Sequence, residues 1–168
     1  MPRTLNANFR DTLEAAFSSE VLVWFATITH NDLDTPVTVN SDVVDYVYNG
    51  VTYIGCAFAF TFLADDDQLP KGQVTIENVD QAIGNMLIAL PDSPVLHLQL
   101  MVRSDFDTSV PRQPIGTPTV EIDAPLLKLR NVQGDVLQIT ADVYGYDLTT
   151  EPWPSTRSTR SRLPGLYA

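Results

Sequence analysis

The period of apolar and polar positions changes along the chain, and each period predicts a different element. Between Asn8 and Ser18, apolar residues recur every three or four positions, which is typical of an amphipathic helix that Asn8 can cap. From Val21 to Thr29 the chain is instead rich in β-branched and aromatic residues, as a buried strand should be. We therefore expect a short helix followed by a buried strand at the start of the fold.

The clearest local signal is a pair of alternating segments around Asn49-Gly50. Asp45–Tyr48 and Val51–Ile54 flank these two residues. A two-residue hairpin turn of the favoured hand needs positive φ at both central positions, which Asn and Gly tolerate best. The sequence therefore predicts a tight β-hairpin here.

Further strands and a second helix fill most of the remaining chain. We expect a helix after Asp80 that Pro91 ends, and a long loop over Ser104–Pro118, which contains three prolines. The other predicted strands are Val37–Asn40, Cys56–Leu63, Gln73–Glu77, Val95–Val102, Val120–Leu129 and Val136–Tyr144. Because strands dominate, we predict a mainly β fold: a β-sandwich or a partly closed β-barrel, with two short helices and an extended C-terminal arm.

Length and composition fit this architecture as a single domain. The chain has 168 residues, of which 44% are hydrophobic and 18% are charged, a globular composition. We expect residues 1–146 to form a single β-rich domain that begins with the N-terminal helix. Residues 147–168 contain three prolines and many Ser, Thr and Arg residues, so we expect an extended C-terminal arm there.

Charge is distributed unevenly between these two parts. The net charge is −11, but residues 1–150 carry −13 while residues 151–168 carry +2. An acidic body repels phosphates, so we expect neither nucleic-acid recognition nor direct membrane insertion. The basic segment could dock onto the acidic face of a neighbouring copy, or it could be a solvated charged tail. No signal peptide is visible, and we expect folding in the cytoplasm.

Histidine and cysteine give little sign of catalysis. His30 and His97 are the only histidines and Cys56 is the only cysteine, and no nucleophile motif accompanies them. Cys56 lies in an apolar run, where a small core residue is expected. The sequence does not exclude a catalytic triad formed by residues that are distant in sequence, but we expect structural roles for these three residues and no catalytic residues.

Acidic clusters are the remaining chemical candidates. Asp65–Asp67 and the pair Asp105 and Asp107 could supply oxygen ligands to calcium, but neither has the ligand spacing of a calcium hand. Solvated acidic loops are the favoured interpretation, so we expect no metal and no cofactor. The chain is therefore predicted not to be an enzyme.

Function is then expected to lie in contact surfaces. Aromatic residues and arginines are favoured as interface anchors, although the tyrosines could equally cover the sheet. The interface candidates are Tyr46, Tyr48, Tyr53, Trp153, Arg157, Arg160, Arg162, Leu166 and Tyr167.

The order of these features resembles a known family. The strand Val21–Ile28, the hairpin Tyr46–Tyr53 and the segment Gly72–Val79 resemble small bacteriophage minor tail proteins, including a family known only as a domain of unknown function. They are also similar in outline to the N-terminal half of the tail-tip protein L of phage lambda. The shared pattern is an aromatic-x-Gly-x-x-Tyr hairpin followed by a strand that ends in Asn, at Tyr48, Gly50, Tyr53 and Asn78.

The resemblance covers about three-quarters of the chain and implies a place in the virion. The chain lacks the cysteine-rich part that holds an iron–sulfur cluster in protein L, so no cluster is implied. The family has no known catalytic residues, so the resemblance implies none here. It implies a hub or adaptor ring at the tail tip that connects the tail tube to a central fibre or spike, after assembly in the host cytoplasm. Expected partners are copies of itself, as a trimer or alternatively a hexamer, and other tail-tip and tail-tube proteins. Alternatives are a tail-associated cell-wall hydrolase and a carbohydrate-binding module for the host surface.

Overall fold

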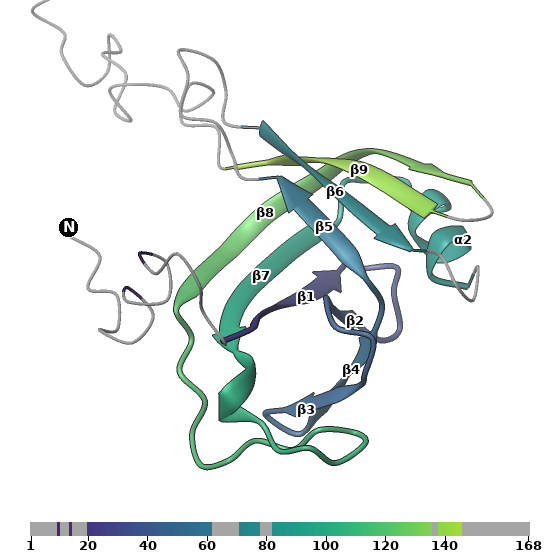
Figure 1. Ribbon diagram of the computed structural model, residues 1–168. Coiled ribbons are helices and arrows are strands. Elements are labelled where there is room, and N and C mark those ends of the chain that lie inside the picture. Colours follow the sequence, from purple (N-terminus) through teal and green to yellow (C-terminus); the bar gives the residue numbers. More distant parts are fainter. Residues whose placement is uncertain are drawn as a thin grey trace, which may run out of the picture.

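A single strongly curved sheet dominates the computed structural model, which describes residues 10, 14, 20–61, 71–77, 82–135 and 138–145 (Figure 1). The prediction of a mainly β fold is confirmed. The predicted helix Asn8–Ser18, apart from residues 10 and 14, and the arm at 147–168 lie outside the described residues. The elements are β1 (Leu22–Thr29), β2 (Val37–Asn40), β3 (Tyr46–Tyr48), β4 (Val51–Gly55), β5 (Phe58–Thr61), β6 (Lys71–Glu77), α2 (Ala82–Ile88), β7 (Val95–Val102), η1 (Arg103–Asp105), β8 (Ile122–Gly134) and β9 (Gln138–Tyr144).

The strand order brings together segments that are far apart in sequence. It runs β3-β4-β2-β1-β7-β8-β9-β6-β5, and every pair is antiparallel except β2 with β4. In Figure 1 the long strands β7 and β8 bend, and beyond them β9, β6 and β5 turn back so that β5 approaches the end of β1. No helix in the described part is long and apolar enough to cross a membrane.

The step from β4 to β5 closes this curve. The two strands lie toward opposite ends of the strand order, yet only Cys56 and Ala57 separate them. Both linking residues are held: the Cys56 N–H donates to the Asn40 carbonyl at 3.1 Å, and the Glu77 N–H donates to the Ala57 carbonyl at 3.2 Å. The predicted strand Cys56–Leu63 is therefore confirmed at Phe58–Thr61 and wrong at Cys56 and Ala57, because the chain leaves one end of the curved sheet at Cys56 and enters the other at Phe58; residues 62 and 63 lie outside the described residues.

Two apolar clusters pack on the two faces of β1. Ala26 and Ile28 point into the larger cluster, enclosed by the curved sheet, together with buried residues of β2, β5, β6, α2, β7, β8 and β9. Val23 and Phe25 point into the smaller cluster on the other face. The continuous apolar run of β1 thus reflects burial on both faces.

Aromatic side chains build the smaller cluster. The Phe25 ring lies 5.5 Å from that of Tyr46, 5.1 Å from that of Tyr53 and 5.6 Å from that of Phe106, measured between ring centroids. Ring pairs at such distances add stabilisation beyond the burial of their area. The cluster therefore holds the β3–β4 hairpin and the loop that follows η1 against β1.

The hairpin prediction is confirmed. β3 pairs antiparallel with β4, and the turn residues Asn49 and Gly50 have φ values of 51° and 76°. The sequence signal worked because few other residues tolerate positive φ at both turn positions.

Candidate interaction surface

The segment between η1 and β8 is a long loop, as predicted, but it is tightly tied to the hairpin. The Val47 N–H donates to the Arg112 carbonyl and the Arg112 N–H donates to the Asp45 carbonyl, both at 2.8 Å. Arg112 thereby pairs with Tyr46 in parallel fashion along the outer edge of β3. The loop covers that strand edge, which would otherwise expose unpaired backbone groups.

Asp107 organises the middle of the loop. Its carboxylate accepts hydrogen bonds from the Ser109 hydroxyl at 2.6 Å, the Gln113 N–H at 2.8 Å and the Ser109 N–H at 3.1 Å. These bonds favour the charged form of the carboxylate and hold the pKa of Asp107 below its usual value. The hydrogen bond from the Ser109 side chain contributes most, followed by that from the Gln113 backbone. One oxygen of this carboxylate, Oδ1, is thus bonded within its own loop. Asp105 is similar, since it accepts the Thr119 N–H at 3.0 Å.

The Arg112 side chain packs beneath the loop against the aromatic cluster and holds the loop in place. It is buried, at 8% exposure, and one guanidinium N–H donates to the Asp107 carbonyl oxygen at 2.7 Å. The guanidinium also lies 5.7 Å from the centroid of the Tyr46 ring, a cation–π contact. Burial, followed by the hydrogen bond that the Tyr46 hydroxyl donates to Asp42 at 2.7 Å, raises the pKa of Tyr46 above its usual value. The loop, the hairpin and the aromatic cluster therefore form a connected unit.

Two large apolar side chains on this fixed loop face solvent. Val110 is 79% exposed and Ile115 is 61% exposed. We call these two residues the loop tip. Single exposed apolar side chains are common, but here the hydrogen bonds of Asp107 and Arg112 hold the backbone that carries them. An ordered loop that presents apolar side chains can bind another protein at a small cost in conformational entropy.

The hairpin tyrosines only partly match the predicted contact surface. Tyr46 and Tyr53 are buried in the smaller cluster, and the Tyr53 hydroxyl lies 3.1 Å from the Thr27 hydroxyl. They are core residues, which corrects their assignment as interface anchors, and the alternative that tyrosines cover the sheet describes them. Tyr48 is half-buried against the same cluster. The other interface candidates lie outside the described residues: Trp153, Arg157, Arg160, Arg162, Leu166 and Tyr167.

The side chains searched for chemistry have structural contacts. His97 Nε2 lies 2.5 Å from Asp123 Oδ1 on the exposed face of the sheet, and His30 Nδ1 accepts the Asp32 N–H at 3.1 Å. Cys56 is buried and its thiol donates to the Glu77 carbonyl at 2.7 Å. In the described part, no hydroxyl or thiol hydrogen-bonds to either imidazole, and no cluster of three metal-ligating side chains occurs. Asp65–Asp67 lies outside it.

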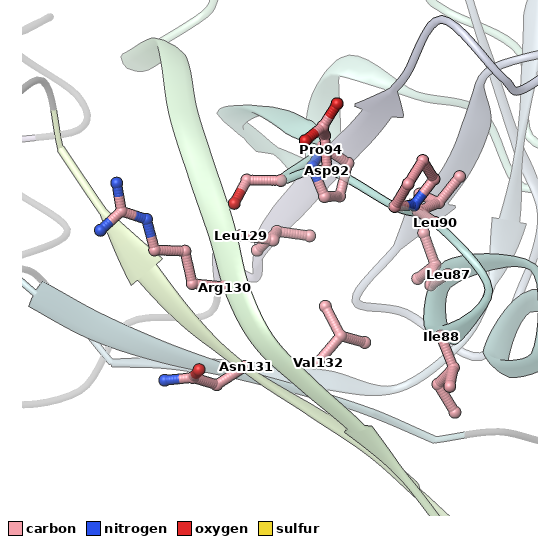
Figure 2. Close-up of a pocket in the computed structure, with 11 residues that line it drawn as sticks. Leu87, Ile88, Leu90, Asp92, Pro94, Leu129, Arg130, Asn131 and Val132 are labelled. Atoms are coloured by element: carbon pink, nitrogen blue, oxygen red, sulfur yellow. The ribbon is translucent and has the colours of Figure 1, made fainter.

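Two shallow pockets adjoin at Leu90 and Pro91, just after α2. One has a volume of about 200 Å³ and lies between this turn and β8; the other, of about 380 Å³, lies between the turn and Asp32–Thr35. Figure 2 shows Leu87 and Leu90 facing Leu129 and Val132 across the smaller pocket. Sequence reasoning missed this surface, because only the pairing of β7 with β8 brings residues 87–94 next to 129–132.

Fold and surfaces together define a mainly β protein with a curved sheet, a loop tied to its hairpin and an apolar depression beside α2. The model of a family described as a domain of unknown function (DUF1833) matches residues 8–158, so the chain belongs to that family. No protein of the curated collection matches the chain.

Proposed function

We propose that the protein is a structural component of a bacteriophage tail tip: a hub or adaptor ring that connects the tail tube to a central fibre or spike. It acts by assembling with copies of itself and with neighbouring tail proteins, and the extended arm at 147–168 takes part in that assembly. The order of strand, hairpin and second strand supports the proposal by its resemblance to phage minor tail proteins. The uneven charge of body and C-terminal segment supports self-association.

The observation that carries the proposal is the fixed loop with its apolar tip. Val110 and Ile115 are exposed on a segment whose backbone is bonded to Asp45 and Val47. Within that segment, Asp107 Oδ1 accepts three hydrogen bonds and one Arg112 guanidinium N–H donates to the Asp107 carbonyl oxygen. A segment built in this way presents a preformed apolar contact to a partner. Stable assemblies bury such contacts at the centre of their interfaces.

Size-exclusion chromatography with light scattering tests the self-association. We expect a homo-oligomer, a trimer in the first place and a hexamer as the alternative. Immunoblots and imaging of purified phage particles are expected to locate the protein at the tail tip. A chain that is monomeric and absent from particles would contradict the proposal, as would turnover of peptidoglycan by the purified protein.

Substitutions in the loop tip test which surface is used. Val110→Asp combined with Ile115→Asp should leave the fold intact, because both side chains already face solvent. Incorporation into particles should fall about tenfold or more, since loss of apolar anchors costs an interface most of its affinity. Leu126→Asp is the matched control: Leu126 is 66% exposed on β8, and Asp tolerates its φ of 67° better than Leu does. Equal incorporation of the loop variant and the control would remove the loop tip from the interface.

A further inference from the structure

The depression beside α2 has an apolar floor. Leu87 and Leu129 are buried at its base, while Leu90 and Val132 are half-buried in its walls, and Figure 2 shows these four side chains converging. The adjoining pocket continues past Leu90 and Pro91 to Leu33 and Ala89. We call the two adjoining pockets the Leu90 groove. Its combined volume suits a few apolar side chains of a peptide segment.

The rim of the Leu90 groove is acidic. Asp32, Asp34 and Asp92 line the two pockets and are exposed. Among the described residues, none of these carboxylates has a Lys or Arg within 4 Å; Asp32 lies 3.8 Å from His30. The arginine in the lining does not neutralise them, because the Arg130 guanidinium lies 5.1 Å from the centroid of the Tyr144 ring and points away from the groove in Figure 2. The groove therefore favours an occupant that is both apolar and basic.

The C-terminal part of this chain has that composition. Arg157, Arg160 and Arg162 are followed at once by the apolar stretch Leu163–Tyr167. Residues 151–168 carry +2, whereas residues 1–150 carry −13. Residues 146–168 follow β9 directly, and 23 extended residues span up to about 75 Å, enough to reach an adjacent subunit.

We propose that the Leu90 groove binds residues 157–167 of a neighbouring copy of this chain. The apolar stretch occupies the pockets, and the arginines pair with the rim carboxylates. Because groove and segment are different surfaces, each subunit donates its segment to the next, a head-to-tail contact that repeats until a ring closes. This inference rests on the proposed function, since it supplies the contact by which the ring assembles.

Charge reversal on each side tests the pairing. The groove variant Asp34→Lys/Asp92→Lys and the segment variant Arg160→Glu/Arg162→Glu each replace attraction by repulsion. We expect self-association of either full-length variant to weaken about tenfold or more, and the loss to shrink at high salt. All four substitutions in a single chain should restore association. Failure of this rescue in variants with unchanged circular dichroism would overturn the proposal.

Mixing the two variants distinguishes exchange between copies from folding back within a copy. The Arg segment of the groove variant fits the Asp groove of the segment variant, and the Glu segment fits the Lys groove. If the contact joins neighbours, two variants that fail to associate alone should co-assemble when mixed, as seen by light scattering and by co-purification through a tag on either chain. Alternating variants close an even-numbered ring such as a hexamer, whereas a trimer would retain one repelling contact and give open chains. If the segment folds onto its own groove, mixing changes nothing, and the proposal is refuted.

The apolar part is tested by a matched pair of isoleucines. Ile88 lines the groove at 49% exposure, and Ile54 lies on β4 at 47% exposure. Ile88→Ser should weaken association several-fold, while Ile54→Ser should not. If the wild type is oligomeric and the groove and segment variants associate as well as it does, this inference is refuted but the proposed function is not. A wild-type chain that never associates would sink both.

Discussion

Gly55, at the end of β4, lies directly against the backbone of the turn between β2 and β3. A Cβ at this position would lie 2.7 Å from the Val43 carbonyl carbon, 2.7 Å from the Val44 nitrogen and 2.8 Å from the Val43 oxygen. These neighbours are backbone atoms and cannot rotate away as a side chain end could. Replacing Gly55 with Ala therefore forces the turn between β2 and β3 to move.

The cost follows from what holds that turn in place. Comfortable contacts between carbon atoms need about 3.5–4.0 Å, so the turn has to shift by close to 1 Å. Two hydrogen bonds hold the turn in place. The side-chain amide of Asn40 donates to the Val44 carbonyl at 3.1 Å, and the Gly55 N–H donates to Asp45 Oδ1 at 2.8 Å. Overpacking costs about 1–3 kcal/mol and a weakened, partly buried hydrogen bond about 1 kcal/mol, so we expect Gly55→Ala to lose about 2–4 kcal/mol of unfolding free energy.

Urea denaturation followed by circular dichroism measures this loss. At about 2–4 °C per kcal/mol for a domain of this size, the midpoint of thermal unfolding should fall by roughly 4–16 °C. Gly116→Ala is the comparison, because Gly116 has a φ of +76° but no atom within 4 Å of the added Cβ. Its cost is conformational, about 1–2 kcal/mol. If Gly55→Ala proves no more destabilising than Gly116→Ala, steric closure of the turn is not what Gly55 provides.

Two further predictions concern pH. The pKa of Asp107 is lower in the folded protein than in the unfolded chain. The charged carboxylate therefore stabilises the fold at pH values above its unfolded pKa of about 3.9, and this stabilisation is lost as pH falls through the folded pKa. In urea titrations, the difference in unfolding free energy between wild type and Asp107→Asn should narrow below about pH 4, and a constant difference would contradict this role. The pKa of Tyr46 is raised, so its contribution is complete below about pH 10 and is lost as pH rises through the higher folded value. Tyr46→Phe should cost about 1 kcal/mol at neutral pH through the lost bond to Asp42 and should lose less further stability in alkali than wild type; an equal alkaline loss would refute this role.

Elements defined by local chemistry could be predicted from the sequence. The turn at Asn49-Gly50 and the strand Val95–Val102 were placed correctly, because turn conformation and alternating burial are properties of a few adjacent residues. Along β7 the even-numbered leucines Leu96 and Leu98 are buried and His97 is half-exposed, as the alternation predicts.

Features that depend on the curvature of the sheet could not be predicted. The break at Cys56 and Ala57 interrupts an apolar run that reads as an unbroken strand. The burial of Tyr46 and Tyr53 depends on Phe106, which is more than fifty residues further along the chain. The Leu90 groove likewise forms only where the turn after α2 meets β8. Each of these is a long-range contact, and a hydrophobic period carries no information about which distant segment supplies it.

The covered edge of β3 limits how a partner can bind at this end of the sheet. An incoming strand would have to displace Arg112, breaking its two backbone bonds to β3, its bond to the Asp107 carbonyl and its contact with the Tyr46 ring. The displaced guanidinium would also leave a space beside the aromatic cluster. Strand addition at β3 is therefore disfavoured, although an uncovered strand edge would offer main-chain hydrogen bonds to any incoming strand. The loop leaves side chains, Val110 and Ile115 among them, as the features a partner can recognise there. In the proposed function, which requires defined neighbours, this arrangement would favour specificity, since side-chain complementarity distinguishes partners better than main-chain pairing does.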